Sequence, residues 1–115
     1  MANIEKKYAD KTFLIAEDDD IAYFYLSEVL MEDTENILRA KNGQEAVDIC
    51  RESKEIDLIL MDIRMPHLNG IEATQRIREF NKDVIIIAQT AFALMGDKDS
   101  TLNAGCNDYI TKPID

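Results

Sequence analysis

Three carboxylates, a hydroxyl and an amine each stand at or directly after the end of a short apolar run. They are Glu17, Asp18, Asp62, Thr90 and Lys112. Carboxylates that share one crevice repel each other, which raises their proton affinity unless a cation neutralises them. Mg²⁺ is the best candidate, because it accepts one or two carboxylates and keeps its other positions for water and phosphate oxygens. The residue types therefore predict a magnesium site with a hydroxyl and an amine beside it.

The elements that must position these side chains alternate between strand and helix. Apolar runs predict strands at residues 12–16, 37–40, 57–61, 84–88 and 108–111. Apolar residues at helical spacing predict a first helix from Ile21 to about Met31, capped by Asp20, and further helices after Asn42-Gly43 and Asn69-Gly70. A weaker, short helix is expected within residues 92–105. This alternation is typical of an α/β fold, a doubly wound five-stranded parallel sheet with helices on both faces.

The five polar residues fall at the carboxyl ends of the predicted strands, where ligands bind in a doubly wound sheet. Taken one at a time they have ordinary explanations. An acid after a strand is usually a loop residue or helix cap, as we expect for Asp19 and Asp20. A lone Thr90 is an ordinary strand-end threonine, and a lone Lys112 is a solvated amine. Their joint placement favours a functional site, because independent surface residues have no reason to gather at one end of consecutive strands.

Composition predicts one domain and excludes several functions. The 115 residues are enough for a single core, and 13 Lys and Arg against 23 Asp and Glu give a net charge of -10. That charge would repel nucleic acid and anionic membrane surfaces, so we expect no direct nucleic acid partner and no membrane contact by this domain. The two cysteines, Cys50 and Cys106, match neither a zinc site nor a redox pair, and no segment is typical of a signal peptide. We therefore expect a cytoplasmic protein.

Four motifs in order give the chain a resemblance to the response regulator receiver family over nearly its whole length. They are Glu17-Asp18, the run Met61-Asp62-Ile63-Arg64-Met65-Pro66 with Gly70 beyond it, Thr90-Ala91, and Lys112-Pro113. The resemblance implies a flavodoxin-like receiver fold with strand order 2-1-3-4-5. It also implies a phosphoacceptor domain of a two-component phosphorelay.

The resemblance implies a role for each site residue. Asp62 would be the nucleophile that takes a phosphoryl group from a phosphohistidine on a histidine kinase or histidine phosphotransfer domain. The Mg²⁺ ion would be held by Asp18, Asp62 and the backbone carbonyl of Arg64, with Glu17 reaching it through water. Lys112 would pair with the phosphoryl oxygens, and its bond to Pro113 is expected to be cis.

The resemblance also implies a conformational switch. The Thr90 hydroxyl would move to contact the phosphoryl group, and Tyr109 would change rotamer to fill the space that Thr90 leaves. A half-buried strand tyrosine with its hydroxyl in water is the alternative explanation for Tyr109. The chain would catalyse its own phosphorylation and dephosphorylation without being a stand-alone metabolic enzyme. Both a segment of a hybrid histidine kinase and a stand-alone regulator stay open.

Three other classes of protein fit less well. A haloacid-dehalogenase-like phosphatase would need a second acid two residues after its nucleophile, where Arg64 stands. A receiver used only for docking would lack Asp62 or Lys112, and both are present. A nucleotide-binding Rossmann domain would need a glycine-rich loop after its first strand.

The sequence ends where the family usually continues into a final helix. We therefore expect residues 1–115 to be a receiver domain truncated after its fifth strand. Leu14, Leu58, Leu60 and the strand at 84–88 would then leave apolar surface open on the face that the first helix shares. A homodimer is then expected, formed either through this uncovered face or by swapping an element between copies.

Overall fold

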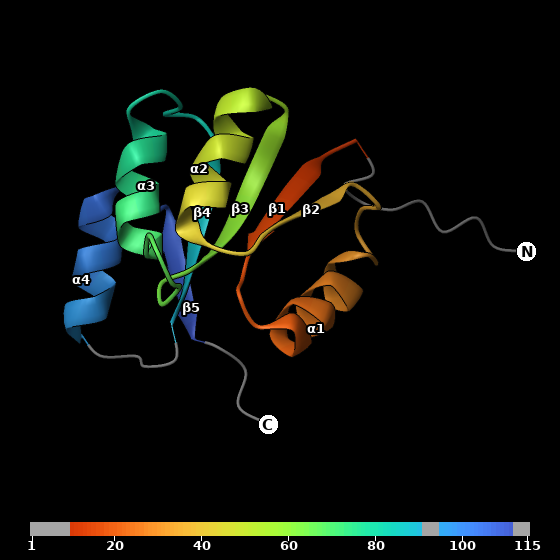
Figure 1. Cartoon of the computed structure of the whole chain (residues 1–115), viewed down its shortest axis with the longest axis horizontal. Coiled ribbons are helices and arrows are strands. Elements are labelled where there is room, and N and C mark those ends of the chain that lie inside the picture. Colours follow the sequence, from red (N-terminus) through yellow and green to blue (C-terminus); the bar gives the residue numbers. More distant parts are fainter. Residues whose placement is uncertain (1–9, 91–94, 112–115) are drawn as a thin grey trace, which may run out of the picture.

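The computed structural model describes residues 10–90 and 95–111, which fold into one parallel sheet with helices on both faces (Figure 1). The sheet has five strands in the order β2-β1-β3-β4-β5, and every neighbouring pair is parallel. The predicted fold class and strand order are therefore confirmed. In chain order the elements are β1 (Thr12–Ala16), α1 (Asp20–Leu30), β2 (Ile37–Ala40), α2 (Gly43–Glu52), β3 (Ile56–Asp62), α3 (Gly70–Arg78), β4 (Ile85–Thr90), α4 (Met95–Ala104) and β5 (Asp108–Thr111).

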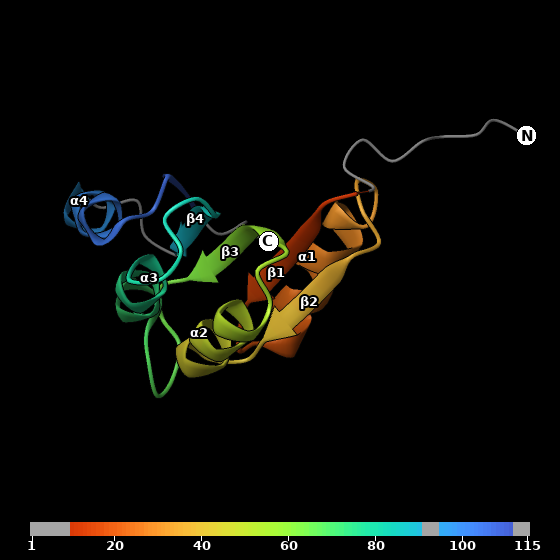
Figure 2. The ribbon, with the colours of Figure 1, turned by 90° about the horizontal axis from the view of Figure 1, so that it is seen from above.

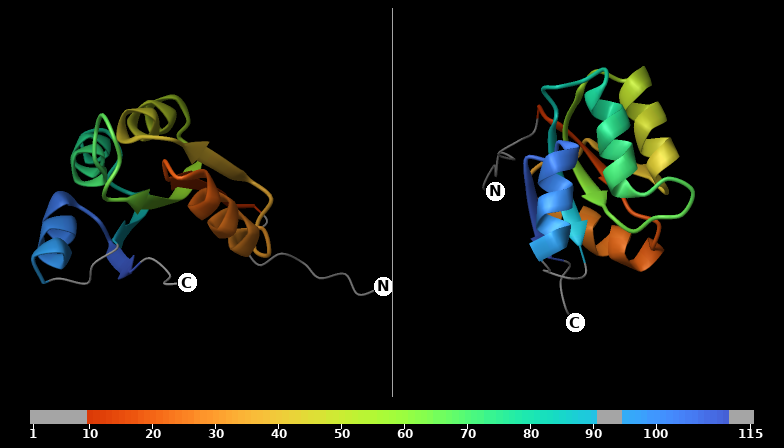
Figure 3. Two further views of the ribbon diagram at one scale, coloured as in Figure 1. Left: turned by 60° about the horizontal axis from the view of Figure 1, so that its bottom comes forward. Right: turned by 90° about the vertical axis from the view of Figure 1, so that its left-hand side faces the viewer.

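The helices are distributed unequally between the two faces of the sheet. Figure 2 shows α2 and α3 side by side along one face, and α4 continues this layer next to α3. Figure 3 shows α1 alone on the opposite face, where it contacts β1 and β2. On the α1 side, the described residues therefore provide a helical cover for only part of the sheet.

The core lies between the sheet and the layer of α2 and α3. Leu14, Ile59 and Ile86 pair in register across β1, β3 and β4, and all three are fully buried. Val47 of α2 and Ile77 of α3 belong to the same cluster. Burying such a side chain contributes about 1.5–3 kcal/mol, so this layer supplies most of the hydrophobic stabilisation. The expectation that Leu14 lies on the α1 side was wrong, because a strand that is apolar on both faces gives no signal of which way each residue points.

The face on the α1 side is open at β4 and β5. Ile85 and Ile110 are 46% and 43% exposed, and Leu58 and Ile87 are half-buried. Register pairs Leu58 with Ile85, which puts both on one face. We call these four residues the open face. The predicted strand at 84–88 is observed at Ile85–Thr90 and is not fully buried, because no helix of the described residues covers Ile85.

Helix α1 carries two adjacent rows of apolar residues that differ in exposure. Ala22 and Leu26 lie in the half-buried row, whereas Ile21 and Tyr25 lie in the other row and are 81% and 54% exposed. The cap is also one residue earlier than predicted, since the Asp19 side chain accepts a hydrogen bond from the Ala22 N–H (3.3 Å).

Both cysteines are free and buried. Burial raises the pKa of the Cys50 thiol to about 11, so it stays protonated at neutral pH. Across residues 10–90 and 95–111, no helix has the length and apolar character required to cross a bilayer.

Candidate functional site

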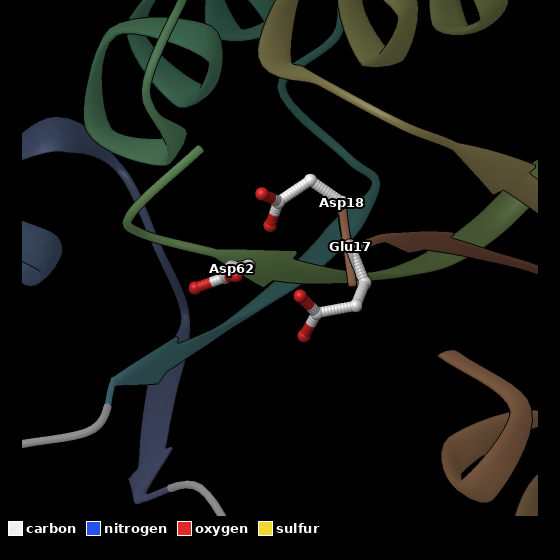
Figure 4. A group of neighbouring side chains, drawn as sticks. All are labelled: Glu17, Asp18 and Asp62. Atoms are coloured by element: carbon white, nitrogen blue, oxygen red, sulfur yellow. The ribbon is translucent and has the colours of Figure 1, made fainter. Parts of the chain in front are cut away.

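The three predicted carboxylates meet at the carboxyl ends of β1 and β3. Glu17, Asp18 and Asp62 each offer an oxygen that lies within 4.8 Å of the other two. Figure 4 shows the three side chains pointing into the same space beside these strand ends. Glu17 and Asp62 are buried, and Asp18 is exposed to solvent. The sequence thus predicted correctly that Asp62 comes together with Glu17 and Asp18, although they are far from it in the chain.

The Asp62 carboxylate is held by the backbone that follows it. Its Oδ1 accepts a hydrogen bond from the Arg64 N–H (3.2 Å), and the Ile63 N–H donates to the Gln89 carbonyl of β4 (3.1 Å). Gly70 closes the loop, because its N–H donates to the Ile63 carbonyl (2.9 Å). A Cβ at Gly70 would lie 2.2 Å from the Asp62 carbonyl oxygen, so only glycine allows α3 to begin this close to the site.

Glu17 is fixed by its main chain and by one of its own carboxylate oxygens. Its N–H donates to the Ala40 carbonyl of β2 (2.9 Å), which extends the β1–β2 ladder by one residue. Its Oε2 accepts a hydrogen bond from the Asp19 N–H (3.2 Å) across the turn that contains Asp18. The carboxylate is therefore drawn inward at the turn, where it contributes negative charge beside Asp62.

The donor set fits a magnesium ion. All three side chains are carboxylates, the hard oxygen ligands that Mg²⁺ prefers. At Mg–O distances of about 2.1 Å, two ligands on opposite sides of the ion lie about 4.2 Å apart. The observed 4.8 Å limit is slightly wider. The spacing suits an ion that binds some of these oxygens directly and others through water.

Thr90 and Tyr109 occupy neighbouring strands on one face of the sheet. Thr90 ends β4, is buried, and pairs with Thr111 of β5. Tyr109 pairs with Ala88, is half-buried and packs against the core cluster. Since alternate residues of a strand share a face, Thr90 lies on the same face as Ala88 and Tyr109. The structure thus brings both predicted switch residues to one side of β4 and β5.

Two expectations concern residues outside the described part of the chain. Lys112 and the predicted cis bond to Pro113 lie there.

Arg64 is within the described part and is exposed. Its N–H contacts the Asp62 carboxylate, so its backbone lies at the site.

One residue at the site was missed by the sequence interpretation. Arg39 of β2 donates two hydrogen bonds to the Glu17 carbonyl and pairs with Asp20. Residue 39 pairs with Ile15 in the β1–β2 register, so its side chain can reach the turn after β1. The only sequence signal is a basic residue near the end of the predicted strand at 37–40. It points to the acidic turn only once the register between β1 and β2 is known.

Comparison with known proteins gives a family. Residues 13–115 match the model of the response regulator receiver domain. Hybrid signal transduction histidine kinase I of Dictyostelium discoideum is 43% identical over 109 residues, which are 88% of this chain and 6% of that protein. The chain thus spans a small part of that kinase.

Two solved structures with substantial sequence identity share the fold. One is the receiver domain of Ssk1 from Saccharomyces cerevisiae, crystallised with the histidine phosphotransfer protein Ypd1, with a TM-score of 0.86, 40% identity, and coverage of 94% of this chain and 82% of that one. The other is the receiver domain of sensor histidine kinase PA1611 from Pseudomonas aeruginosa PAO1, with magnesium in its active-site cleft, a TM-score of 0.81, 35% identity, and coverage of 93% and 88%. Sequence, fold and strand-end residues agree, and the chain belongs to the response regulator receiver family as a receiver domain of a two-component system.

Proposed function

We propose that this chain accepts a phosphoryl group on Asp62 from a phosphohistidine of a histidine kinase or histidine phosphotransfer domain. The observation that carries this proposal is the convergence of Glu17, Asp18 and Asp62 at one end of the sheet. The Ssk1 receiver, 40% identical, was crystallised with a histidine phosphotransfer protein, which supports a partner of that class. The hybrid kinase relative supports an origin within a larger signalling protein. A cytoplasmic location is part of this proposal.

Asp62 acts as the nucleophile. One of its carboxylate oxygens attacks phosphorus, the P–N bond to the donor imidazole breaks, and the electron pair of that bond returns to the ring nitrogen. Hydrolysis of the resulting aspartyl phosphate restores the carboxylate. The Arg64 N–H, which donates to Oδ1, helps to orient the carboxylate for this attack.

Asp18, Asp62 and the Arg64 carbonyl would hold Mg²⁺, with Glu17 acting through water. When bound, the ion supplies positive charge that offsets the carboxylates and the incoming phosphoryl oxygens. Lys112 would pair with those oxygens, as the family resemblance implies. The Thr90 hydroxyl would donate a hydrogen bond to a phosphoryl oxygen, and Tyr109, on the same face, would then repack.

The experiment that tests this function is phosphorylation of the purified chain. Incubation with a phosphorylated histidine phosphotransfer domain, or with acetyl phosphate, is expected to add the mass of one phosphoryl group in the presence of Mg²⁺. Chelation of Mg²⁺ by EDTA should prevent the addition. Intact-mass spectrometry measures both. No addition from either donor in Mg²⁺ would refute the proposal.

Magnesium is also expected to stabilise the chain without phosphate, because it relieves repulsion among the three carboxylates. A ligand at about ten times its Kd contributes roughly 1.4 kcal/mol, which raises Tm by a few degrees. Asp18→Ala should remove most of that rise, and Asp48→Ala, which removes an exposed acid on α2, should keep it. Thermal unfolding with and without Mg²⁺ measures the rise. An Asp18→Ala variant that keeps the full response would put the metal elsewhere.

A further inference from the structure

The Arg39 side chain joins both ends of the turn that carries Asp18. Its Nε and Nη2 both donate to the Glu17 carbonyl oxygen, at 3.2 and 3.1 Å. The same Nη2 lies 2.8 Å from Asp20 Oδ1. Glu17 immediately precedes Asp18, and Asp20 is the first residue of α1. One guanidinium therefore contacts the residue before Asp18 and the start of the helix after it.

The guanidinium is itself held in place. Its central carbon lies 4.4 Å from the centroid of the Tyr23 ring of α1, a cation–π distance, and the side chain is only 17% exposed. Its backbone belongs to β2, which is paired with β1. A planar group fixed by a strand at its base and by an aromatic ring at its tip loses little freedom when it donates several hydrogen bonds. Arg39 is thus built as a rigid clamp rather than a mobile surface charge.

The charge of Arg39 and its position make opposite predictions for the affinity of the site for Mg²⁺. A positive charge close to a metal site repels the ion, so charge alone predicts that loss of Arg39 tightens Mg²⁺ binding. A clamp that keeps Asp18 and Glu17 turned toward Asp62 predicts that its loss weakens binding. The Asp20 carboxylate lies 2.8 Å from the guanidinium and offsets much of its charge, which reduces the repulsion.

We propose that Arg39 is a positioning residue that holds the turn between β1 and α1 in the shape that binds Mg²⁺. The inference rests on the proposed function, because it concerns the same three carboxylates. Partners that orient metal ligands without touching the metal typically change metal affinity by about 10–100-fold when they are removed. Arg39→Gln is therefore expected to weaken Mg²⁺ binding by about tenfold.

The test is titration of Mg²⁺ into the purified chain by isothermal calorimetry, with wild type, Arg39→Gln and Arg39→Lys. A lysine keeps the charge but lacks the planar fork that reaches two acceptors while it stacks on Tyr23, so Arg39→Lys should resemble Arg39→Gln. Phosphorylation by acetyl phosphate at increasing Mg²⁺ gives a second readout. Arg39→Gln should need more Mg²⁺ for half-maximal rate and should reach the wild-type rate at saturation.

Arg51→Gln is the matched control, because Arg51 of α2 also lies over an aromatic ring, Phe80 (5.1 Å), and its loss removes the same charge. This variant should bind Mg²⁺ like wild type. Unchanged or tighter binding in Arg39→Gln, or full rescue by Arg39→Lys, would overturn the clamp. If Arg39→Gln does not fold, wild-type affinity in Arg39→Lys overturns it alone. A wild type that binds no Mg²⁺ would refute the proposed function instead, so the two failures are distinguishable.

Discussion

Asp62→Asn is expected to lose phosphoryl incorporation completely. An amide oxygen is a poor nucleophile toward phosphorus and cannot form a stable acyl phosphate, so asparagine cannot replace the carboxylate. Asparagine is nearly the same size, and its oxygen can still accept the hydrogen bond that the Arg64 N–H donates to Oδ1. The variant should therefore fold. It should also lose one of the repelling charges beside Glu17 and Asp18.

The measurement is intact-mass spectrometry after incubation with acetyl phosphate and Mg²⁺. Asp57→Asn is the matched control, because Asp57 lies near the other end of β3, where its Oδ2 accepts a hydrogen bond from the Thr12 N–H (2.9 Å). That variant should gain one phosphoryl group as wild type does. A full mass shift that persists in Asp62→Asn would mean that another residue is phosphorylated and would end this assignment.

Much of the fold was predictable because the sequence carries its signals locally. β1 is an apolar run that stops at four consecutive acids, and its bounds at residues 12–16 were predicted as observed. β2 and β5 were also predicted with the observed bounds. The acids could be brought together because parallel strands present their carboxyl ends at one edge of the sheet. The meeting of Glu17, Asp18 and Asp62 followed from topology alone.

The features that were missed depend on tertiary context. β1, β3 and β4 are apolar on both faces, so the pattern cannot say which residues point toward α1, and the side assigned to Leu14 of β1 was wrong. Helix α1 has two adjacent apolar rows, and only packing decides that Ala22 and Leu26 face the sheet while Ile21 does not. The role of Arg39 requires the register between β1 and β2, which no local pattern encodes.

The open face indicates where a further segment of the chain, or a second copy of it, would bind. Ile85 and Ile110 are nearly half exposed on β4 and β5, beside the half-buried Leu58 and Ile87. On the same side of the sheet, α1 leaves Ile21 and Tyr25 exposed as well. Contiguous apolar patches of more than a few hundred Å² are uncommon on monomers. We propose that the natural chain continues beyond Asp115 into a helix that covers the open face, and that the 115-residue chain alone pairs with a second copy there.

Extending the chain by the next 12–15 residues or so of its gene, a typical helix length, is therefore expected to stabilise it. Burial contributes about 25 cal/mol per Å², so covering a few hundred Å² yields several kcal/mol before the ordering entropy of the new helix is subtracted. A net gain of about 2 kcal/mol would raise Tm by roughly 8 °C in a domain of this size. Thermal unfolding measures the gain, and analytical ultracentrifugation should find a dimer for the 115-residue chain and a monomer for the extended one.

A flexible Gly/Ser extension of equal length is the control, because it adds mass and residues without an apolar face, and it should change neither Tm nor association.

Ile85→Thr distinguishes the two ways of covering the open face, by a second copy of the chain or by the added helix. In the 115-residue chain this change should weaken dimerisation, since it makes the shared surface more polar. In the extended chain it should instead lower Tm, because there the same side chain is buried against the helix. A 115-residue chain that stays monomeric at high concentration, together with an extension that leaves Tm unchanged, would show that nothing needs to cover this face.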